Sequence, residues 1–387
     1  MTGFDTLPLT RPASQLVTIF GGSGFLGRHV VRALAKRGYR IRVAVRRPDL
    51  ALFLQPLGKV GQIVAVQANL RYPDSVARAV AGSSVVINLV GILQEAGAQS
   101  FSRLQADGAG EIARQAAANG AAMVQVSAIG ADPDSGSAYA RSKADGEAQV
   151  FAACPDAIVF RPSLIFGTGD SFFNRFASLA RALPVLPLAG AETRFQPVFV
   201  GDVAEAIARA VEGKVPAGKV YELGGPEVAT LEHLVRYMLE TVQRRRMVVS
   251  LPLPAARIQA RIMEIANTLT LGLLPDELKL TRDQVTLLQT DNVVSEAAKA
   301  EGRTIEALGI SPTAAEAVVP GYLWRFRKAG QFATGRGTED QAEVPDTLAN
   351  APLDPGSQHR PARASGPAIG PDAAKPSQMG TRWGTRG

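Results

Sequence analysis

Three residues in the first half of the chain, Ser127, Tyr139 and Lys143, have types and a spacing suited to acid–base chemistry. Tyr139 and Lys143 are four residues apart, so they share one face if their segment is helical. A nearby ammonium favours the phenolate and would lower the pKa of a tyrosine from its ordinary value of about 10. We predict that the pair moves a proton and that Ser127 orients a substrate carbonyl, although ligand binding alone would also require Tyr139 and Lys143.

A second motif, GGSGFLG at residues 21–27, follows the apolar run LVTIF and precedes the helix-like segment RHVVRALAKRG. Glycines at 21, 24 and 27 permit a sharp turn and close approach to a ligand, and a helix N-terminus attracts phosphate. The GxxGxxG spacing differs from the standard GxGxxG dinucleotide motif, and no Gly-Lys-Ser/Thr follows, which excludes a P-loop. A tight strand–helix turn without a ligand stays open as the alternative.

The next apolar run, RIRVAV at residues 40–45, ends in Arg46 and Arg47. NAD sites normally carry an acid here to bind the adenosine ribose, whereas a guanidinium suits the extra phosphate of NADP. We predict NADP(H) as the cofactor, with NAD(H) less favoured. The alternative is that two arginines merely flank a strand end.

Apolar runs alternate with helical patterns over the first half of the chain. We expect strands near 16–20, 40–45, 63–66, 84–89, 122–127 and 157–161, and helices near 25–37, 73–81, 101–119 and 138–153. Continuous apolar strands separated by helices indicate a parallel sheet that is covered on both faces. The predicted fold class is therefore α/β, a Rossmann-type doubly wound sheet with a smaller C-terminal lobe.

The second half has fewer clear patterns. Residues 220–226 (VYELGGP) predict a late strand and turn, and the segment 253–274 places Ile258, Ile262, Ile265 and Leu269 on one helical face. That face either packs on the protein's own core or contacts a partner. The predicted domains are a flexible N-terminus (1–14), a nucleotide-binding domain (15–250), a helical lobe (251–330) and a disordered tail (331–387), which is poor in large apolar residues.

Composition narrows the class of protein. The 387 residues carry a formal charge of +7, which suggests anionic partners, but no nucleic-acid-binding motif is evident. The histidines lack ligands at metal-binding spacing, so we expect no metal site. With one cysteine, no apolar run long enough to span a membrane and no recognisable targeting segment, we expect a protein that acts in a bacterial cytoplasm.

Taken together, GGSGFLG, NLVG (88–91), Ser127, YARSK (139–143) and RPSLIFG (161–167) resemble an extended or atypical short-chain dehydrogenase/reductase over roughly residues 14–330. Three longer stretches, at 161–176, 195–207 and 280–294, resemble the NADPH-binding accessory subunits of respiratory complex I, the NADH:ubiquinone oxidoreductase. The resemblance assigns the pyrophosphate to Gly21, Ser23, Gly24, Phe25, Leu26 and Gly27 and the 2′-phosphate to Arg46 and Arg47. Asn69 and Leu70 would lie near adenine, although many relatives carry Asp in place of Asn69. The nicotinamide half would contact Asn88, Leu89, Val90, Gly91, Tyr139, Lys143 and Pro162.

The same resemblance implies a function. It suggests an accessory subunit that holds NADPH with little or no turnover and stabilises complex I near the quinone site. Such a subunit would bind peripherally on the cytoplasmic side of the bacterial inner membrane, through complex I subunits and anionic lipid. Its contact surface would include 253–274 and the basic run Arg244–Arg246. The main alternative is a soluble NAD(P)-dependent reductase, dehydratase or epimerase with a Ser-Tyr-Lys site, and an NADP(H)-sensing regulator is the third.

Overall fold

The computed structural model describes residues 14–95, 97, 99–252, 254, 255, 261 and 281–328. The predicted disordered tail, the first 13 residues and nearly all of the predicted helix at 253–274 lie outside these residues. The predicted boundaries between the domains stay predictions.

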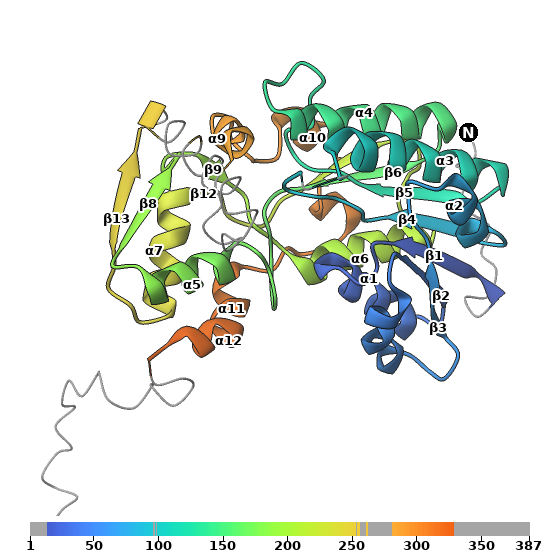
Figure 1. Cartoon of the computed structure of the whole chain (residues 1–387), viewed down its shortest axis with the longest axis horizontal. Helices are drawn as coiled ribbons and strands as arrows, with labels where there is room; N and C mark the ends of the chain where they lie inside the picture. Colours follow the sequence, from blue (N-terminus) through green and yellow to red (C-terminus); the bar gives the residue numbers. More distant parts are fainter. Residues whose placement is uncertain are drawn as a thin grey trace, which may run out of the picture. The chain divides into compact units, whose positions relative to one another are not determined.

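A parallel sheet of seven strands forms the centre of the described chain (Figure 1). In sequence its strands are β1 (Leu16–Phe20), β2 (Arg40–Val45), β3 (Ile63–Gln67), β4 (Val85–Asn88), β5 (Ala122–Val126), β6 (Ile158–Pro162) and β11 (Val220–Leu223). Their order across the sheet is β11-β6-β5-β4-β1-β2-β3, so the chain reverses its direction of travel between β1 and β4. Ligands of open α/β sheets bind at the carboxyl ends of the strands near such a switch point.

Helices cover both faces of the sheet (Figure 1). One face packs against α1 (Phe25–Lys36), the 3-10 segment η2 (Pro48–Leu57) and α6 (Val200–Val211). The other face packs against α2 (Pro73–Val80), α3 (Gly108–Ala118) and α4 (Ala138–Ala153). This arrangement confirms the predicted doubly wound fold. The helix predicted over 101–119 is not uniform, because it opens with a π-helical turn, η3 (Ser102–Asp107).

A second apolar core lies in a smaller lobe built from α5 (Phe173–Ala182), β8 (Val185–Ala189), α7 (Leu231–Thr241), α11 (Ala315–Val318), α12 (Pro320–Leu323) and the 3-10 turn η6 (Trp324–Phe326). Strand β13 (Met247–Leu251) pairs in parallel with β8. Short strand pairs join β7 (Ile165–Phe166) to β10 (Val198–Phe199) and β9 (Arg194–Phe195) to β12 (Ala229–Thr230). None of these elements was predicted, because their apolar runs are short and interrupted.

The basic run that was expected on a contact surface is partly used inside this lobe. Arg244 Nε donates to the carbonyl of Phe326 at 2.9 Å, and Arg246 Nε donates to that of Ala180 at 2.7 Å. Through these two hydrogen bonds, the arginines link the segment after α7 to η6 and to α5 within the small lobe.

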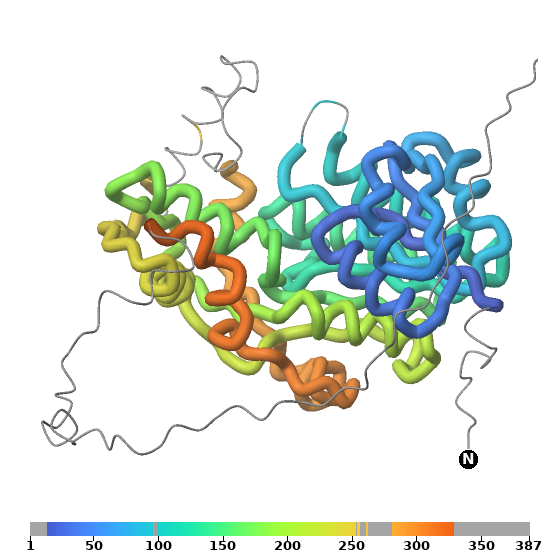
Figure 2. The backbone as a smooth tube through the Cα atoms, turned by 90° about the horizontal axis from the view of Figure 1, so that it is seen from below, coloured from blue at the N-terminus to red at the C-terminus, as the bar shows by residue number. Residues whose placement is uncertain are grey.

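The chain after residue 281 returns from the small lobe to the sheet through α9 (Arg282–Leu287) and α10 (Glu296–Ala300). It then passes the 3-10 turn η5 (Glu306–Leu308) and re-enters the small lobe, orange to red in Figure 2. Ile305 and Ile310 are buried in the core under the sheet, whereas Tyr322 and Leu323 are buried in the lobe.

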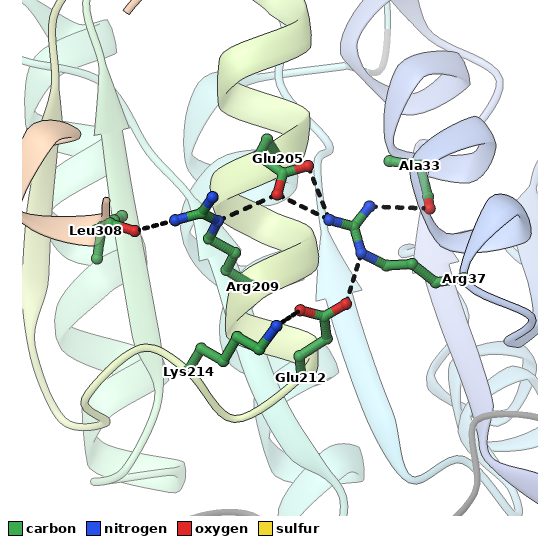
Figure 3. A network of polar contacts seen from close by, with 7 residues as sticks. All are labelled: Ala33, Arg37, Glu205, Arg209, Glu212, Lys214 and Leu308. Carbon is green, nitrogen blue, oxygen red and sulfur yellow. Dashed lines mark hydrogen bonds and ion pairs between the residues drawn. The ribbon is translucent and has the colours of Figure 1, made fainter. Parts of the chain in front are cut away.

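An ion-pair network fastens the end of α1 to α6 (Figure 3). Arg37 contacts Glu205 at 2.8 Å and Glu212 at 2.6 Å, and Arg209 links Glu205 to the carbonyl of Leu308. Burial alone would raise the pKa values of both carboxyl groups, but Arg37 and Arg209 lower that of Glu205, and Lys214 and Arg37 lower that of Glu212. The network holds in place the helix that begins at the glycine-rich turn.

Candidate NAD(P)-binding site

The glycine-rich turn joins β1 to α1 at the switch point of the sheet. Gly21 has φ +75°, and a Cβ atom there would lie 3.2 Å from the backbone of Leu89. A Cβ atom on Gly27 would lie only 2.4 Å from the carbonyl oxygen of Gly21. Glycine is thus required at 21 by the backbone angle and at 27 by the close packing of the helix on the turn.

This turn leaves the start of α1 available to an anion. Gly24 is the exposed N-cap residue, and the N–H groups of the first helical turn, Phe25 to Gly27, have no partner within the helix. Among the described residues no side chain caps this end, and the first turn has no acid. Together with the half-buried Ser23, these groups can accept a pyrophosphate at the positive end of the helix dipole.

Arg46 and Arg47 are both exposed directly after β2. Arg47 is paired with Asp49 at 2.7 Å, with side-chain exposures of 67% and 58%, so the pair contributes little to stability. In the described part of the chain, Arg46 forms no ion pair. Asp49, an acid near the strand end, was not expected from the sequence; a ligand phosphate would have to compete with it for Arg47.

The predicted adenine contacts follow β3. The Asn69 side-chain oxygen accepts the N–H of Arg71 at 3.1 Å, while the Asn69 N–H donates to Ser75 Oγ at 3.0 Å. Leu70 packs against Gly108, where a Cβ atom would lie 2.8 Å from Leu70 Cδ1. These local hydrogen bonds fix the turn, and within the residues that the structure describes the side-chain nitrogen of Asn69, Nδ2, has no hydrogen-bond partner.

Asn88, the last residue of β4, fixes the loop that follows this strand, and it is 1% exposed. Its Nδ2 donates to Gln125 Oε1 at 2.9 Å, and its Oδ1 accepts the N–H of Val90 at 3.0 Å. Asn88 thus shapes the half-buried Leu89 and Val90 and the exposed Gly91 from within the sheet. The role of Gln125 was not predictable, because nothing in its local pattern distinguishes it from a polar residue on a strand surface.

Ser127 and Pro162 lie at the same edge of the sheet, after β5 and at the end of β6. Ser127 is 4% exposed, and its Oγ has no hydrogen-bond partner within the described residues. Pro162 is buried, and its carbonyl accepts the N–H of Ile129 at 3.1 Å. A buried hydroxyl without a partner is costly, so Ser127 favours a ligand that would supply one.

Tyr139 and Lys143 share one face of α4, as predicted. Lys143 Nζ lies 5.9 Å from the centre of the Tyr139 ring, and Phe101 contacts that ring edge-on at 5.8 Å. Lys143 is 6% exposed and lies next to the loop after β4, since a Cβ atom on Gly91 would be 3.3 Å from Nζ. The structure therefore brings Lys143 together with the predicted nicotinamide loop.

The expected effect of Lys143 on the Tyr139 pKa is wrong. Burial raises the pKa of Tyr139 to about 12 instead of lowering it. Burial also lowers the pKa of Lys143 to about 8, with a smaller opposing effect from Glu147, which is paired with Arg161 at 2.6 Å. The apolar surroundings disfavour both charged forms, and this effect outweighs the attraction between phenolate and ammonium.

The site as a whole fits a dinucleotide. The glycine turn is a cradle that a side chain would fill. Among the residues that the structure describes, the helix start has free N–H groups, and the buried Ser127 hydroxyl has no partner. Within the described residues there is no cluster of three or more His, Cys, Asp or Glu side chains that could hold a metal ion, nor a helix that could span a membrane.

Comparisons with known proteins agree with this geometry. Residues 17–224 match the NAD dependent epimerase/dehydratase family. The mitochondrial NADH dehydrogenase (ubiquinone) 1 alpha subcomplex subunit 9 of Arabidopsis thaliana is 34% identical over 320 residues, which are 81% of this chain and 79% of the relative. A ceramide reductase of Caulobacter vibrioides is 38% identical over 192 residues, 50% of this chain and 59% of the relative.

Among solved structures, an Escherichia coli NADPH-dependent quinone oxidoreductase in complex with NADPH has a TM-score of 0.59. It is 20% identical, and the alignment covers 78% of this chain and 98% of that one, which supports the fold alone. The chain belongs to the NAD-dependent epimerase/dehydratase family with its NAD(P)-binding Rossmann fold, and within it to the group that contains subunit 9 of the complex I alpha subcomplex.

Proposed function

We propose that this protein is an NADP(H)-holding accessory subunit of respiratory complex I, with little or no turnover of its own. The observation that carries the proposal is the similarity to subunit 9 over about four fifths of both chains. Since 81% of this chain takes part, the similarity extends beyond the nucleotide-binding core at residues 17–224.

Each part of the cofactor has residues suited to it. We assign the pyrophosphate to the glycine turn and the start of α1, and the 2′-phosphate to Arg46 with Arg47. Asn69 and Leu70 would contact adenine, and the loop Asn88–Gly91 with Tyr139, Lys143 and Pro162 would contact the nicotinamide half. When bound, the nicotinamide ring supplies a hydride donor or acceptor.

The protonation states of Tyr139 and Lys143 are compatible with holding the cofactor through hydrogen bonds. At neutral pH a tyrosine with a pKa of about 12 stays neutral and keeps its hydroxyl proton. A lysine with a pKa of about 8 stays mostly charged there. Both side chains are then hydrogen-bond donors, which suits ribose hydroxyls.

We further propose peripheral attachment on the cytoplasmic side of a bacterial inner membrane, near the quinone site of the complex. The formal charge of +7 supports contact with acidic protein surface or anionic lipid. The segment 253–274 remains our proposed contact surface. Arg244 and Arg246 would contribute their guanidinium charges to it, although both also donate hydrogen bonds within the protein.

A specific observation also favours the alternative, a reductase with a Ser-Tyr-Lys site. Ser127 Oγ lacks a partner among the described residues, as a group that binds a substrate carbonyl would. The similarity to the ceramide reductase over half of this chain supports the same alternative.

The test is gentle solubilisation of membranes from cells that carry an epitope tag on this chain, followed by native electrophoresis. We expect the tagged chain to migrate with the NADH dehydrogenase and to release NADP(H) on denaturation. A chain that is wholly soluble, absent from the complex and active on a carbonyl substrate would establish the reductase instead.

A further inference from the structure

The segment from Thr281 to Ser295, here called the strap, crosses the carboxyl edge of the sheet beside the cofactor site. Asn292 Nδ2 donates to the carbonyl of Ile129, two residues after Ser127, at 3.1 Å. Ser163, directly after β6, lies 2.7 Å from Asn292 Oδ1, and Ser295 N–H donates to Glu222 of β11 at 2.7 Å. The strap thus contacts the ends of β5 and β6 and the last strand of the sheet.

At its other end the strap binds the start of α4 through Asp283. Asp283 Oδ1 accepts the N–H of Ala138 at 2.7 Å, and Oδ2 accepts the hydroxyl of Ser137 at 2.8 Å and the N–H of Tyr139 at 3.3 Å. Ser137, fully buried, accepts the N–H of Ala140 at 3.3 Å in turn. Three N–H groups of the first turn are thereby satisfied.

This cap is supplied from a distant part of the sequence. The first turn of α4 contains no acid of its own, so Asp283 provides the negative charge that a helix N-terminus favours. Asp283 itself is held at the start of α9, where Thr281 and Gln284 form a capping box. The carboxylate therefore has a fixed position relative to α4.

Tyr139 lies within the turn that Asp283 caps. Its backbone N–H is bonded to Asp283, and its ring is held between Phe101 and Lys143. We propose that Asp283 is a positioning residue for the cofactor, which places Tyr139 by fixing the first turn of α4. This inference rests on the proposed function, in which Tyr139 contacts the nicotinamide half.

A consequence is that cofactor binding and docking of the strap are linked. If a fixed first turn of α4 strengthens cofactor binding, then bound cofactor must stabilise the Asp283 contact by the same factor. Bound NADPH should therefore slow amide exchange both at residues 138–140 and in the strap.

The experiment compares Asp283→Asn with the matched control Asp291→Asn in the full chain. Asp291 is also on the strap and also accepts a backbone N–H, from Arg194 at 2.9 Å, but it faces the small lobe. An asparagine at 283 replaces one acceptor oxygen by an NH₂ group that faces donors. We expect NADPH to bind about tenfold more weakly to Asp283→Asn, as for a lost charged hydrogen bond, and within about twofold of wild type to Asp291→Asn, since the Asp291 bonds lie away from α4.

A second ligand separates positioning from general loosening. The fragment 2′,5′-ADP carries only the adenine and phosphate half, so Asp283→Asn should bind it as wild type does. Equal weakening for NADPH and the fragment, or no weakening for either, overturns the inference. If Asp283→Asn does not fold, Ser137→Ala removes one donor to the carboxylate and should weaken NADPH alone by a smaller factor. Wild-type protein that binds neither NADPH nor NADH would instead overturn the proposed function, and this inference with it.

Discussion

Lys143 and Tyr139 lie one helical turn apart on α4, with 5.9 Å between the Lys143 Nζ atom and the centre of the Tyr139 ring, and burial moves their pKa values in opposite directions. Lys143 is the more informative of the two. It is a buried ammonium whose neighbouring acid, Glu147, is already paired with Arg161. Without cofactor, the protein would therefore be more stable if position 143 carried no charge.

Replacing Lys143 by methionine should stabilise the cofactor-free protein near pH 7. The pKa falls from 10.5 in the unfolded chain to about 8 in the folded one. Below pH 8 both states are protonated, so the folded state bears the whole cost, about 3 kcal/mol at most. Between about pH 8 and 10.5 only the unfolded chain keeps the proton, so the stability of wild type rises with pH and the advantage of Lys143→Met disappears.

Thermal unfolding of both proteins from pH 7 to 10.5 measures this difference, and an NADPH titration should show weaker binding by Lys143→Met. The control is Lys299→Met, which removes an equal charge at an exposed ion pair with Glu296. That variant should not gain stability. A Lys143→Met protein that is less stable than wild type at pH 7 would contradict the prediction.

The second prediction concerns Arg46 and Arg47. Replacing both by alanine should weaken NADPH binding by on the order of 1.5–3 kcal/mol per lost charged hydrogen bond and leave NADH binding nearly unchanged. Arg78→Ala is the control for the loss of surface charge, since it removes one positive charge from an exposed position at the end of α2, compared with two in the double variant. Fluorescence titrations with both cofactors provide the measurement. Native protein that releases only NAD(H) on denaturation would rule out the preference.

The strands were predictable because β1, β2, β4, β5 and β6 are short, nearly continuous apolar runs rich in Val and Ile. The glycine turn, Ser127 and the Tyr139–Lys143 pair followed from their places at strand ends and on a helix, which are local properties. Asp49 and Asp283 were missed, although both shape the site. Asp283 caps a helix that starts 145 residues earlier, and no local pattern carries such a contact. The prediction of a lowered pKa for Tyr139 was wrong for the same reason, since the burial that raises this pKa depends on the whole fold.

Tyr139→Phe separates holding from catalysis. The phenylalanine ring retains the edge-on contact with Phe101, so the fold and assembly should stay near wild type. Loss of the hydroxyl removes one hydrogen bond to the cofactor and should weaken NADPH binding by about 0.5–1.5 kcal/mol. If the protein is an accessory subunit, wild type itself should show no turnover above background with NADPH and a broad set of carbonyl compounds. Robust turnover by wild type that disappears in Tyr139→Phe would support the reductase.

The last prediction concerns the packing of α1 on the glycine turn. In Gly27→Ala the new methyl group would lie 2.4 Å from the Gly21 carbonyl oxygen and 2.6 Å from Gly22, both backbone atoms that belong to the turn. The helix must then move away from the turn, which should cost about 1–3 kcal/mol of stability and disrupt the pyrophosphate contacts. Gly321→Ala is the matched control, because a Cβ atom on Gly321 meets nothing within 4 Å and its helix should gain slightly from alanine. The measurements are stability in chemical denaturation and the NADPH content of the purified variants. Gly27→Ala should lose stability and bound NADPH, whereas Gly321→Ala should lose neither. A Gly27→Ala protein that retains its cofactor would show that the turn does not bind the pyrophosphate.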